Sequence, residues 1–389
     1  MQITQSIYQI GVHDTQIDLF EGQFPVPDGM SYHSYLILDE KITVIDSVEI
    51  SFSNEWLSHI KKLIGDKKPD YLIIQHMEPD HSGSIMHFMN LYPECTIAAS
   101  QLAFTMMKNM FHTDFSDRRL ILKNQNNLNL GNHCLHFFCA PFVHWPEVIM
   151  SYESTQQILF SADAFGSFGC TSSLDNWKNE ARRYYFNIVG KYGVQVQQIL
   201  NQLSTVEIQM ICPLHGPILE TQLSYYVHLY DKWSSYQPEQ SGVTITYTSF
   251  YGNTKQAVLL LKNYLQKKGI QNISFIDLVR DDLSYAVSES FKNSHLILAS
   301  PTYNGTCSAA MKNFLHHLTD RNFSNHTISL IENSSWSPMS IKSMKNILSV
   351  CKNIHYTNST VQITSVIDSN TFNQIQQLAD EIILSLQST

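Results

Sequence analysis

The chain has 389 residues, a length that favours two domains over a single core. Its formal net charge of −9 disfavours nucleic acid as a partner, and its 43% hydrophobic and 15% charged composition is typical of a soluble globular protein. No run of 18 apolar residues occurs and the N-terminus lacks a secretory signal, so no membrane segment is predicted. The seven cysteines are odd in number and form no Cys-x-x-Cys pair, so we expect reduced thiols in a cytoplasmic protein.

The first half of the chain predicts two sheets packed face to face with outer helices. Short apolar runs bounded by turns predict strands at 34–38, 42–45, 70–75, 96–99, 134–138, 158–160 and 208–212. Helical periodicity predicts helices at 54–64 and 182–203.

The second half changes to a regular alternation of strands and helices. A polar stretch at 233–242 predicts the linker, which places one domain at 1–238 and the other at 243–389. Strands are predicted at 243–247, 273–278, 295–299, 327–331 and 360–366, and helices at 254–267, 283–292, 309–318, 340–352 and 371–386. This alternation indicates a doubly wound α/β fold with a parallel sheet.

A cluster of potential metal ligands follows the strand at 70–75. The residues are His76, Glu78, Asp80 and His81, and further candidates follow later strands at His144, Asp163 and His215. Four imidazoles and three carboxylates suffice for two metal ions if one carboxylate bridges them. Two buried imidazoles beside two carboxylates carry a large desolvation cost without a cation, so the cluster itself predicts a metal site.

The types of ligand decide which metal is expected. Imidazole with carboxylate suits iron, manganese or zinc, and the absence of thiolate disfavours soft ions. The cluster resembles the signature of the metallo-β-lactamase fold, whose hydrolases read His-x-His-x-Asp-His, but Glu78 replaces the second histidine. The added negative charge stabilises ferric iron, which zinc hydrolysis does not need. We therefore expect a redox di-iron centre, with a carboxylate such as Asp163 holding the metals roughly 3.5–4 Å apart.

Three polar loops follow strands of the second domain and meet at the edge where such sheets bind ligands. The first suits a phosphate, because it offers hydroxyls and the N–H groups of a helix N-terminus. The other two carry aromatic residues that can cover a flat ring. The candidate flavin-binding residues are Thr248, Ser249, Phe250, Tyr251, Gly252, Asn253 and Thr254 in the first loop, Ser300, Pro301, Thr302, Tyr303, Asn304 and Gly305 in the second, and Ser334, Ser335 and Trp336 in the third.

Taken in order, these motifs resemble the flavodiiron proteins over nearly the whole chain. The matching segments read His-x-Glu-x-Asp-His, His-Trp-Pro, Ser-Ala-Asp-Ala-Phe-Gly and Pro-Leu-His-Gly-Pro. The resemblance implies a metallo-β-lactamase-like αββα sandwich followed by a flavodoxin-like domain. It implies one iron on His76, Glu78 and His144, a second on Asp80, His81 and His215, and Asp163 as the bridge. It also implies FMN on the three polar loops.

The resemblance further implies an oxidoreductase. FMN relays electrons from an external donor to the di-iron centre, which reduces dioxygen to water, nitric oxide to nitrous oxide, or both. The donor is expected to be a rubredoxin-like protein, a flavoprotein reductase or a reduced deazaflavin. A head-to-tail homodimer or a dimer of dimers is expected, and the ending of the chain after the flavodoxin-like region suggests the minimal two-domain class.

Two alternatives remain at this point. One is a metallo-hydrolase of the β-lactamase fold fused to a flavodoxin-like electron-transfer module, against which Glu78 and the flavin loops argue. The other is an electron carrier with a purely structural metal, which would need a closed coordination shell.

Overall fold

The computed structural model describes residues 1–170 and 173–387. The chain forms two compact units, one of Met1–Tyr185 with Val194–Asp231 and one of Phe186–Gly193 with the chain from Lys232 onward. Within the expected linker at 233–242, only residues 235–239 are irregular, because one helix ends at Ser234 and the next strand begins at Gln240. The domain boundaries predicted from the sequence stay a prediction. No helix among the described residues is long and apolar enough to cross a membrane.

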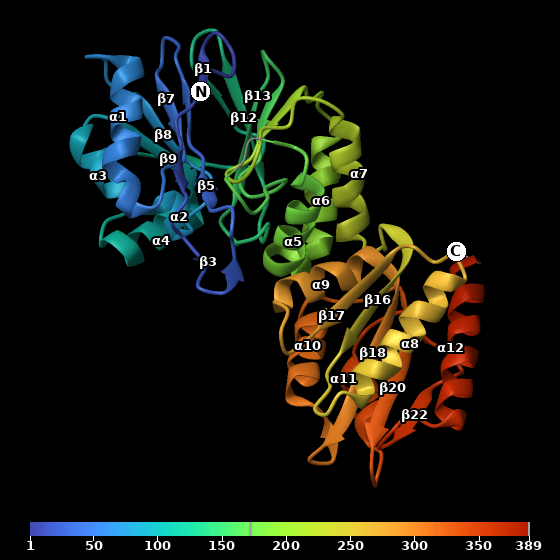
Figure 1. The fold of residues 1–389 in the computed structure, drawn as a ribbon. Helices are drawn as coiled ribbons and strands as arrows, with labels where there is room; N and C mark the ends of the chain where they lie inside the picture. The colour runs from blue at the N-terminus through green and yellow to red at the C-terminus, as the bar shows by residue number, and fades with distance from the viewer. Residues whose placement is uncertain (171–172, 388–389) are drawn as a thin grey trace. The chain divides into compact units, whose positions relative to one another are not determined.

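The first unit contains two sheets that lie between layers of helices (Figure 1). One sheet has the order β1 (Ile7–Gln9), β6 (Tyr35–Ile37), β7 (Thr43–Ile45), β8 (Tyr71–Ile74), β9 (Thr96–Ser100) and β10 (Arg119–Leu122). The other has the order β11 (Asn127–Asn129), β12 (Cys134–Cys139), β13 (Ile149–Glu153), β14 (Ile158–Phe160) and β15 (Met210–Cys212). The rings of Tyr35 and Phe160 meet between them at 5.0 Å, so the inner faces of the two sheets form the core.

Helices cover the outer sides of this sandwich and short ribbons extend it. The helices are α1 (Ser53–Ile64), α2 (Pro79–Ser82), α3 (Ile85–Leu91), α4 (Gln101–Phe111), α5 (Trp177–Tyr184), α6 (Gly193–Leu203) and α7 (Leu223–Ser234). The ribbons pair β2 (Val12–Asp14) with β5 (Met30–Tyr32) and β3 (Leu19–Phe20) with β4 (Phe24–Pro25). In α1, Trp56, Ile60 and Ile64 are spaced by four residues and buried, which is the pattern of a helix with one apolar face.

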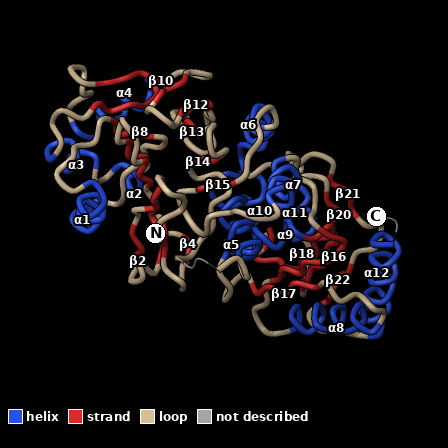
Figure 2. The backbone as a smooth tube through the Cα atoms, turned by 90° about the horizontal axis from the view of Figure 1, so that it is seen from above, coloured by secondary structure: helices blue, strands red, loops and turns tan. Residues whose placement is uncertain are grey.

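The second unit is a parallel sheet with helices on both faces, as expected (Figure 2). Its strands are β16 (Gln240–Tyr247), β17 (Ile273–Asp277), β18 (Asn293–Tyr303), β19 (Thr306–Cys307), β20 (His326–Ser334), β21 (Ile354–Tyr356) and β22 (Val361–Thr364). The order β17-β16-β18-β20-β21, with β22 also beside β20, is that of flavodoxin-like folds. The helices α8 (Asn253–Lys267) and α12 (Ser369–Gln387) cover one face, and α9 (Leu283–Lys292), α10 (Ala309–Asp320) and α11 (Ser340–Leu348) cover the other.

The predicted helix at 182–203 is wrong as a single element. The structure has α5, a π-helical turn at Tyr185–Val189, a short turn at Gly190–Tyr192, and then α6. Gly193 begins α6 directly after this interruption, and a Cβ atom there would lie 2.3 Å from the carbonyl oxygen of Ser234, so the close backbone approach requires a glycine. The apolar periodicity continues through this interruption, and for that reason the sequence pattern did not show it.

Strands of the second unit also run further than predicted. Ser300, Pro301, Thr302 and Tyr303 were expected in a loop but belong to β18, and Ser334 belongs to β20. The neighbouring strand β16 has already ended at Tyr247, so Pro301 lies in a stretch of β18 that has β20 but not β16 beside it. A proline, which lacks the N–H group, is tolerated in such an edge position.

Two buried histidines of the second unit make its stability depend on pH. Burial lowers the pKa of His295 to about 3 and that of His326 to about 4. Both histidines are neutral when folded, and the unfolded chain binds protons below about pH 6.5. The contribution of these histidines to the free energy of unfolding is therefore fully present above pH 6.5. It falls as the pH drops toward 4, by about 2 kcal/mol per histidine at pH 5. Urea unfolding of wild type and His295→Asn at pH 7 and pH 5 measures this loss. An unchanged pH dependence in the variant would contradict it.

Candidate functional site

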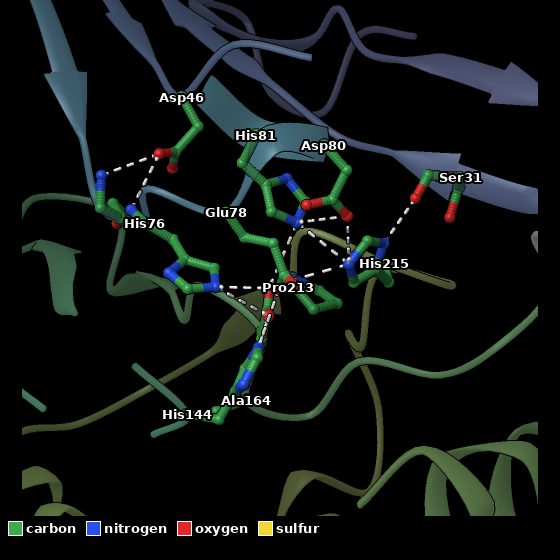
Figure 3. Close-up of polar contacts among 12 residues, drawn as sticks. Ser31, Asp46, His76, Glu78, Asp80, His81, His144, Ala164, Pro213 and His215 are labelled. Atoms are coloured by element: carbon green, nitrogen blue, oxygen red, sulfur yellow. Dashed lines mark hydrogen bonds and ion pairs between the residues drawn. The ribbon is translucent and has the colours of Figure 1, made fainter. Parts of the chain in front are cut away.

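The end of strand β8 places four polar side chains in a buried volume. Leu72, Ile73 and Ile74 of β8 are buried between β7 and β9, and the chain then turns through residues 75–78 into helix α2. Pro79 occupies the first helical position, for which its fixed φ and missing N–H group suit it. His76 and Glu78 extend from the turn, and Asp80 and His81 extend from α2 (Figure 3).

Asp46, immediately after β7, holds this turn in place. One of its carboxylate oxygens, Oδ1, accepts hydrogen bonds from the backbone N–H groups of Gln75 at 2.8 Å and His76 at 3.3 Å. Asp46 is fully buried, and this burial raises its pKa to about 7. These bonds fix the backbone of the turn, which limits how far His76 and Glu78 can move apart.

The first group of ligands gathers at the Oδ2 atom of Asp163, in the segment after β14. The Nε2 atoms of His144 and His76 lie 3.1 and 3.4 Å from this oxygen. The Oε2 atom of Glu78 lies 3.0 Å from His144 Nε2 and 3.3 Å from His76 Nε2. These four residues are buried and close enough together to share one metal ion.

The second group gathers at the other oxygen of the same carboxylate. The Nε2 atoms of His81 and His215 lie 3.3 and 3.8 Å from Asp163 Oδ1. Both also face Asp80 Oδ2, at 3.2 and 3.3 Å, and they approach each other to 3.0 Å. Asp80, His81 and His215 thus form a second set that suits one metal ion.

Each oxygen of Asp163 therefore faces a different ligand group. Asp163 is fully buried, and among the described residues neither of its oxygens has a partner that meets hydrogen-bond geometry, since only the imidazole nitrogens of the two groups face them. Both oxygens of Asp80 likewise lack such a partner. Orphaned buried carboxylate oxygens are costly unless a cation compensates them. The donor set of nitrogen and oxygen fits a pair of divalent or trivalent metal ions with Asp163 between them.

Neighbouring groups fix which ring nitrogen of two histidines faces the site. His76 donates its Nδ1–H to Glu147 Oε1 at 2.9 Å, and that oxygen also accepts the backbone N–H of Met77 at 2.8 Å. His215 donates its Nδ1–H to the carbonyl oxygen of Ser31 at 2.7 Å. In both rings the Nε2 lone pair is left to point toward Asp163, which is the usual arrangement around metal-binding histidines.

The site is strongly charged in the absence of a cation. Burial alone would lower the pKa of His81 and His144, but the surrounding carboxylates, Asp80 and Asp163 for His81 and Asp163 and Glu78 for His144, outweigh it and raise these pKa values to about 10 and about 9. The pKa of Asp163 is held well below its usual range, because His76, His144 and His81 outweigh its burial. Metal ions entering such a site replace protons as the compensating charge.

Tyr184 and Glu21 also lie near the site and, like Asp46 and Glu147, were not found from the sequence. Tyr184 on α5 is fully buried with its ring 5.5 Å from that of His215, and its hydroxyl has no hydrogen-bond partner among the described residues. Burial and then the charges of Asp163 and Glu78 raise the pKa of Tyr184 well above its usual value, so it keeps its proton. Glu21 is exposed as a residue, but its carboxyl end is desolvated against Glu78, which raises its pKa to about 8.

The three expected flavin loops lie at one edge of the parallel sheet in the second unit. Gly252 has φ of +93° and immediately precedes α8, so the turn into the helix favours a glycine. Large aromatic side chains are left open to solvent here, with Tyr251 96%, Trp336 80% and Tyr303 55% exposed. Such exposed apolar rings around a helix N-terminus fit a phosphate-bearing ligand with a flat ring system.

Some of the expected flavin residues are buried in the structure, and their role in binding stays a prediction. Thr248, Ser300 and Thr254 are buried, and the hydroxyl of Thr248 is bonded to Ser308 at 2.7 Å. The hydroxyl of Ser249 accepts the backbone N–H of Lys255 at 3.2 Å, so it lies at the start of α8 as expected. The sequence pattern identifies the loops, but burial decides which of their side chains face outward.

Two families of known proteins match the two halves of the chain. Residues 30–216 match the ODP family of β-lactamases, and residues 249–365 match the NADPH-dependent FMN reductases. The chain is 31% identical to the putative diflavin flavoprotein A 2 of Synechocystis sp., over 71% of this chain and 50% of that protein. It is 29% identical to the nitric oxide reductase of Moorella thermoacetica, over 78% of this chain and 77% of that protein. The chain thus spans about half the length of the diflavin relative.

Solved structures match over the whole chain. The rubredoxin oxygen:oxidoreductase of Desulfovibrio gigas superposes with a TM-score of 0.92 at 25% identity, over 100% of this chain and 98% of that one. The flavodiiron protein of Giardia intestinalis superposes with a TM-score of 0.91 at 25% identity, over 100% and 97%. These matches confirm the predicted fold of both halves.

Glu147 is expected to strengthen metal binding through His76. Glu147→Gln keeps the acceptor oxygen but removes the negative charge, and we expect metal affinity to fall by about tenfold or more, as at other sites where an orienting carboxylate is lost. Competition with a chromophoric chelator measures the affinity. The matched control is Glu153→Gln, another buried carboxylate of the same unit, which accepts backbone N–H groups of Thr155 and Gln156 instead. Equal losses in both variants would contradict a specific role for Glu147.

Proposed function

Because the chain belongs to the flavodiiron proteins, we propose that it reduces dioxygen to water, nitric oxide to nitrous oxide, or both. The observation that carries the proposal is the buried carboxylate of Asp163, whose two oxygens face two separate ligand groups. The resident groups would be two iron ions and FMN. His76, Glu78 and His144 would hold one iron, Asp80, His81 and His215 the other, Asp163 would serve both, and the three loops would hold FMN.

The reactions consume only electrons and protons besides the gas. Dioxygen takes four electrons and four protons to give two waters, and two nitric oxides take two electrons and two protons to give nitrous oxide and water. The iron pair supplies open coordination positions and a change between the ferrous and ferric states. FMN supplies a store of electrons that an external donor refills.

The residues of the chain prepare this site in three ways. Glu147 and the carbonyl group of Ser31 orient the rings of His76 and His215. Phe20, Tyr32 and Tyr184 surround the ring of His215, which excludes water on that side. The carboxylates Glu78, Asp80 and Asp163 contribute the negative charge that favours the more oxidised metal pair. A hydrolase would gain nothing from that charge, which is why the fused metallo-hydrolase is the weaker alternative.

The partners are proposed on the same basis. The relative from Desulfovibrio gigas carries rubredoxin in its name, so a rubredoxin-like protein is one suitable donor, beside a flavoprotein reductase or a reduced deazaflavin. We also propose the head-to-tail homodimer, or a dimer of dimers, that the family resemblance implies. A monomer with full turnover would refute the dimer.

Turnover with each gas tests the function. Reduced protein, supplied with electrons through a rubredoxin and its reductase, is expected to consume dioxygen, nitric oxide or both. Iron analysis and the absorption spectrum are expected to give about two irons and one flavin per chain. Two zinc ions, no flavin and no consumption of either gas would contradict the proposal and favour the hydrolase.

Tyr184 is expected to assist turnover with its unpaired hydroxyl. A buried donor beside the metal site can hydrogen-bond to a bound substrate, and losing one such donor typically slows catalysis by about a hundredfold or more. Tyr184→Phe should therefore lower kcat while the iron content stays the same. The control is Tyr152→Phe, whose hydroxyl already donates to the carbonyl group of Glu207 away from the site. Unchanged kcat in Tyr184→Phe would exclude this role.

A further inference from the structure

Three buried hydroxyl groups from separate segments meet beneath the flavin loops. Thr248 follows β16, Ser300 lies in β18, and Ser308 precedes α10. The Thr248 hydroxyl lies 2.7 Å from that of Ser308 and 3.3 Å from that of Ser300, and the two serine hydroxyls are 3.3 Å apart. All three side chains are at most 2% exposed. We call Thr248, Ser300 and Ser308 the hydroxyl cluster.

The hydroxyl cluster also anchors the backbone around it. Ser300 Oγ accepts the backbone N–H of Ser308 at 3.1 Å, and Ser308 Oγ accepts the backbone N–H of Met311 at 3.4 Å, which caps α10. The hydroxyl of Thr248 has its two bonds within the cluster. The described partners of this hydroxyl are therefore the two serine hydroxyls of the cluster.

A second set of bonds ties each of the two ring-side segments, residues 300–305 and 332–338, to the start of α11. Thr302 Oγ1 accepts the backbone N–H groups of Met339 and Ser340 at 3.0 and 3.1 Å, at the start of α11. Glu332 Oε2 accepts the N–H of Ile341 at 3.1 Å, and this carboxylate is 3% exposed. The hydroxyl cluster links Thr248, which immediately precedes the phosphate loop (residues 249–254), to Ser300 of the first ring-side segment. The rings of Phe250 and Tyr303, 5.3 Å apart, make a second contact between the same two parts of the chain.

We propose that the hydroxyl cluster couples the phosphate loop to the ring-side segments, so that both halves of the flavin site are positioned together. The inference rests on the FMN binding proposed above. Removing the Thr248 hydroxyl takes one hydrogen-bond partner from each of the buried hydroxyls of Ser300 and Ser308. The loops then shift so that these hydroxyls find new partners. A phosphate contact such as Ser249 acts differently, because its loss affects only the phosphate.

Binding of two ligands distinguishes a coupling residue such as Thr248 from a phosphate contact such as Ser249. FMN and riboflavin share the ring system, and only FMN carries the phosphate. We expect Thr248→Val, which keeps the shape of the side chain, to raise the Kd of both ligands by a similar factor, on the order of tenfold. Thr248→Ser, which keeps the hydroxyl, should bind FMN and riboflavin with the Kd values of the wild type. Ser249→Ala should weaken FMN and leave riboflavin unchanged.

The measurement is quenching of flavin fluorescence by the full chain after its flavin has been removed. Ser290→Ala is the matched control, because it removes another buried hydroxyl of the same unit, which donates to the carbonyl group of Ala286 away from the loops. This control should leave both Kd values unchanged even if it lowers thermal stability.

Three results would overturn the inference. A Thr248→Val variant that loses affinity for FMN alone would make Thr248 a phosphate contact, and unchanged affinity for both ligands would remove any role in binding. A loss that Thr248→Ser does not restore would show that the hydroxyl is not responsible. Failure of the proposed function would look different, because the wild-type chain itself would then bind neither flavin.

Discussion

The buried carboxylate of Asp163 is the group on which the metal site depends. Each of its two oxygens faces a different ligand group, and neither oxygen accepts a regular hydrogen bond from the described residues. A fully desolvated carboxylate of this kind is tolerated only beside positive charge. Two metal ions would supply that charge, and four histidines and two further carboxylates are gathered where they would hold them.

The scaffold positions these groups from the ends of strands. Asp46 after β7, the turn after β8 and Asp163 after β14 come from both sheets of the sandwich, so the site forms where the two sheets meet. The flavin loops of the second unit likewise lie beyond the ends of parallel strands, and they are held by buried hydroxyls rather than by the ligand alone. In both units, rigid strands position the irregular segments that are proposed to bind metal or flavin.

The seven candidate ligands could be picked from the sequence because they follow strands, and the structure brings them together in two groups. Glu147 lies three residues after His144 in the sequence, yet nothing in the local pattern tells that it bonds to His76 rather than to solvent. Tyr184 lay inside a region that the periodicity predicted as one helix, and its burial beside the metal site is a tertiary property. Thr248 has the right chemistry for a phosphate, but packing turns its hydroxyl inward.

Anomalous X-ray diffraction at the iron edge, from crystals of the iron-loaded protein, tests the central claim most directly. The account predicts two iron peaks roughly 3.5–4 Å apart, one beside each oxygen of Asp163. The first should lie among His76, Glu78 and His144, and the second among Asp80, His81 and His215. A single iron, or two irons that do not share Asp163, would contradict the account.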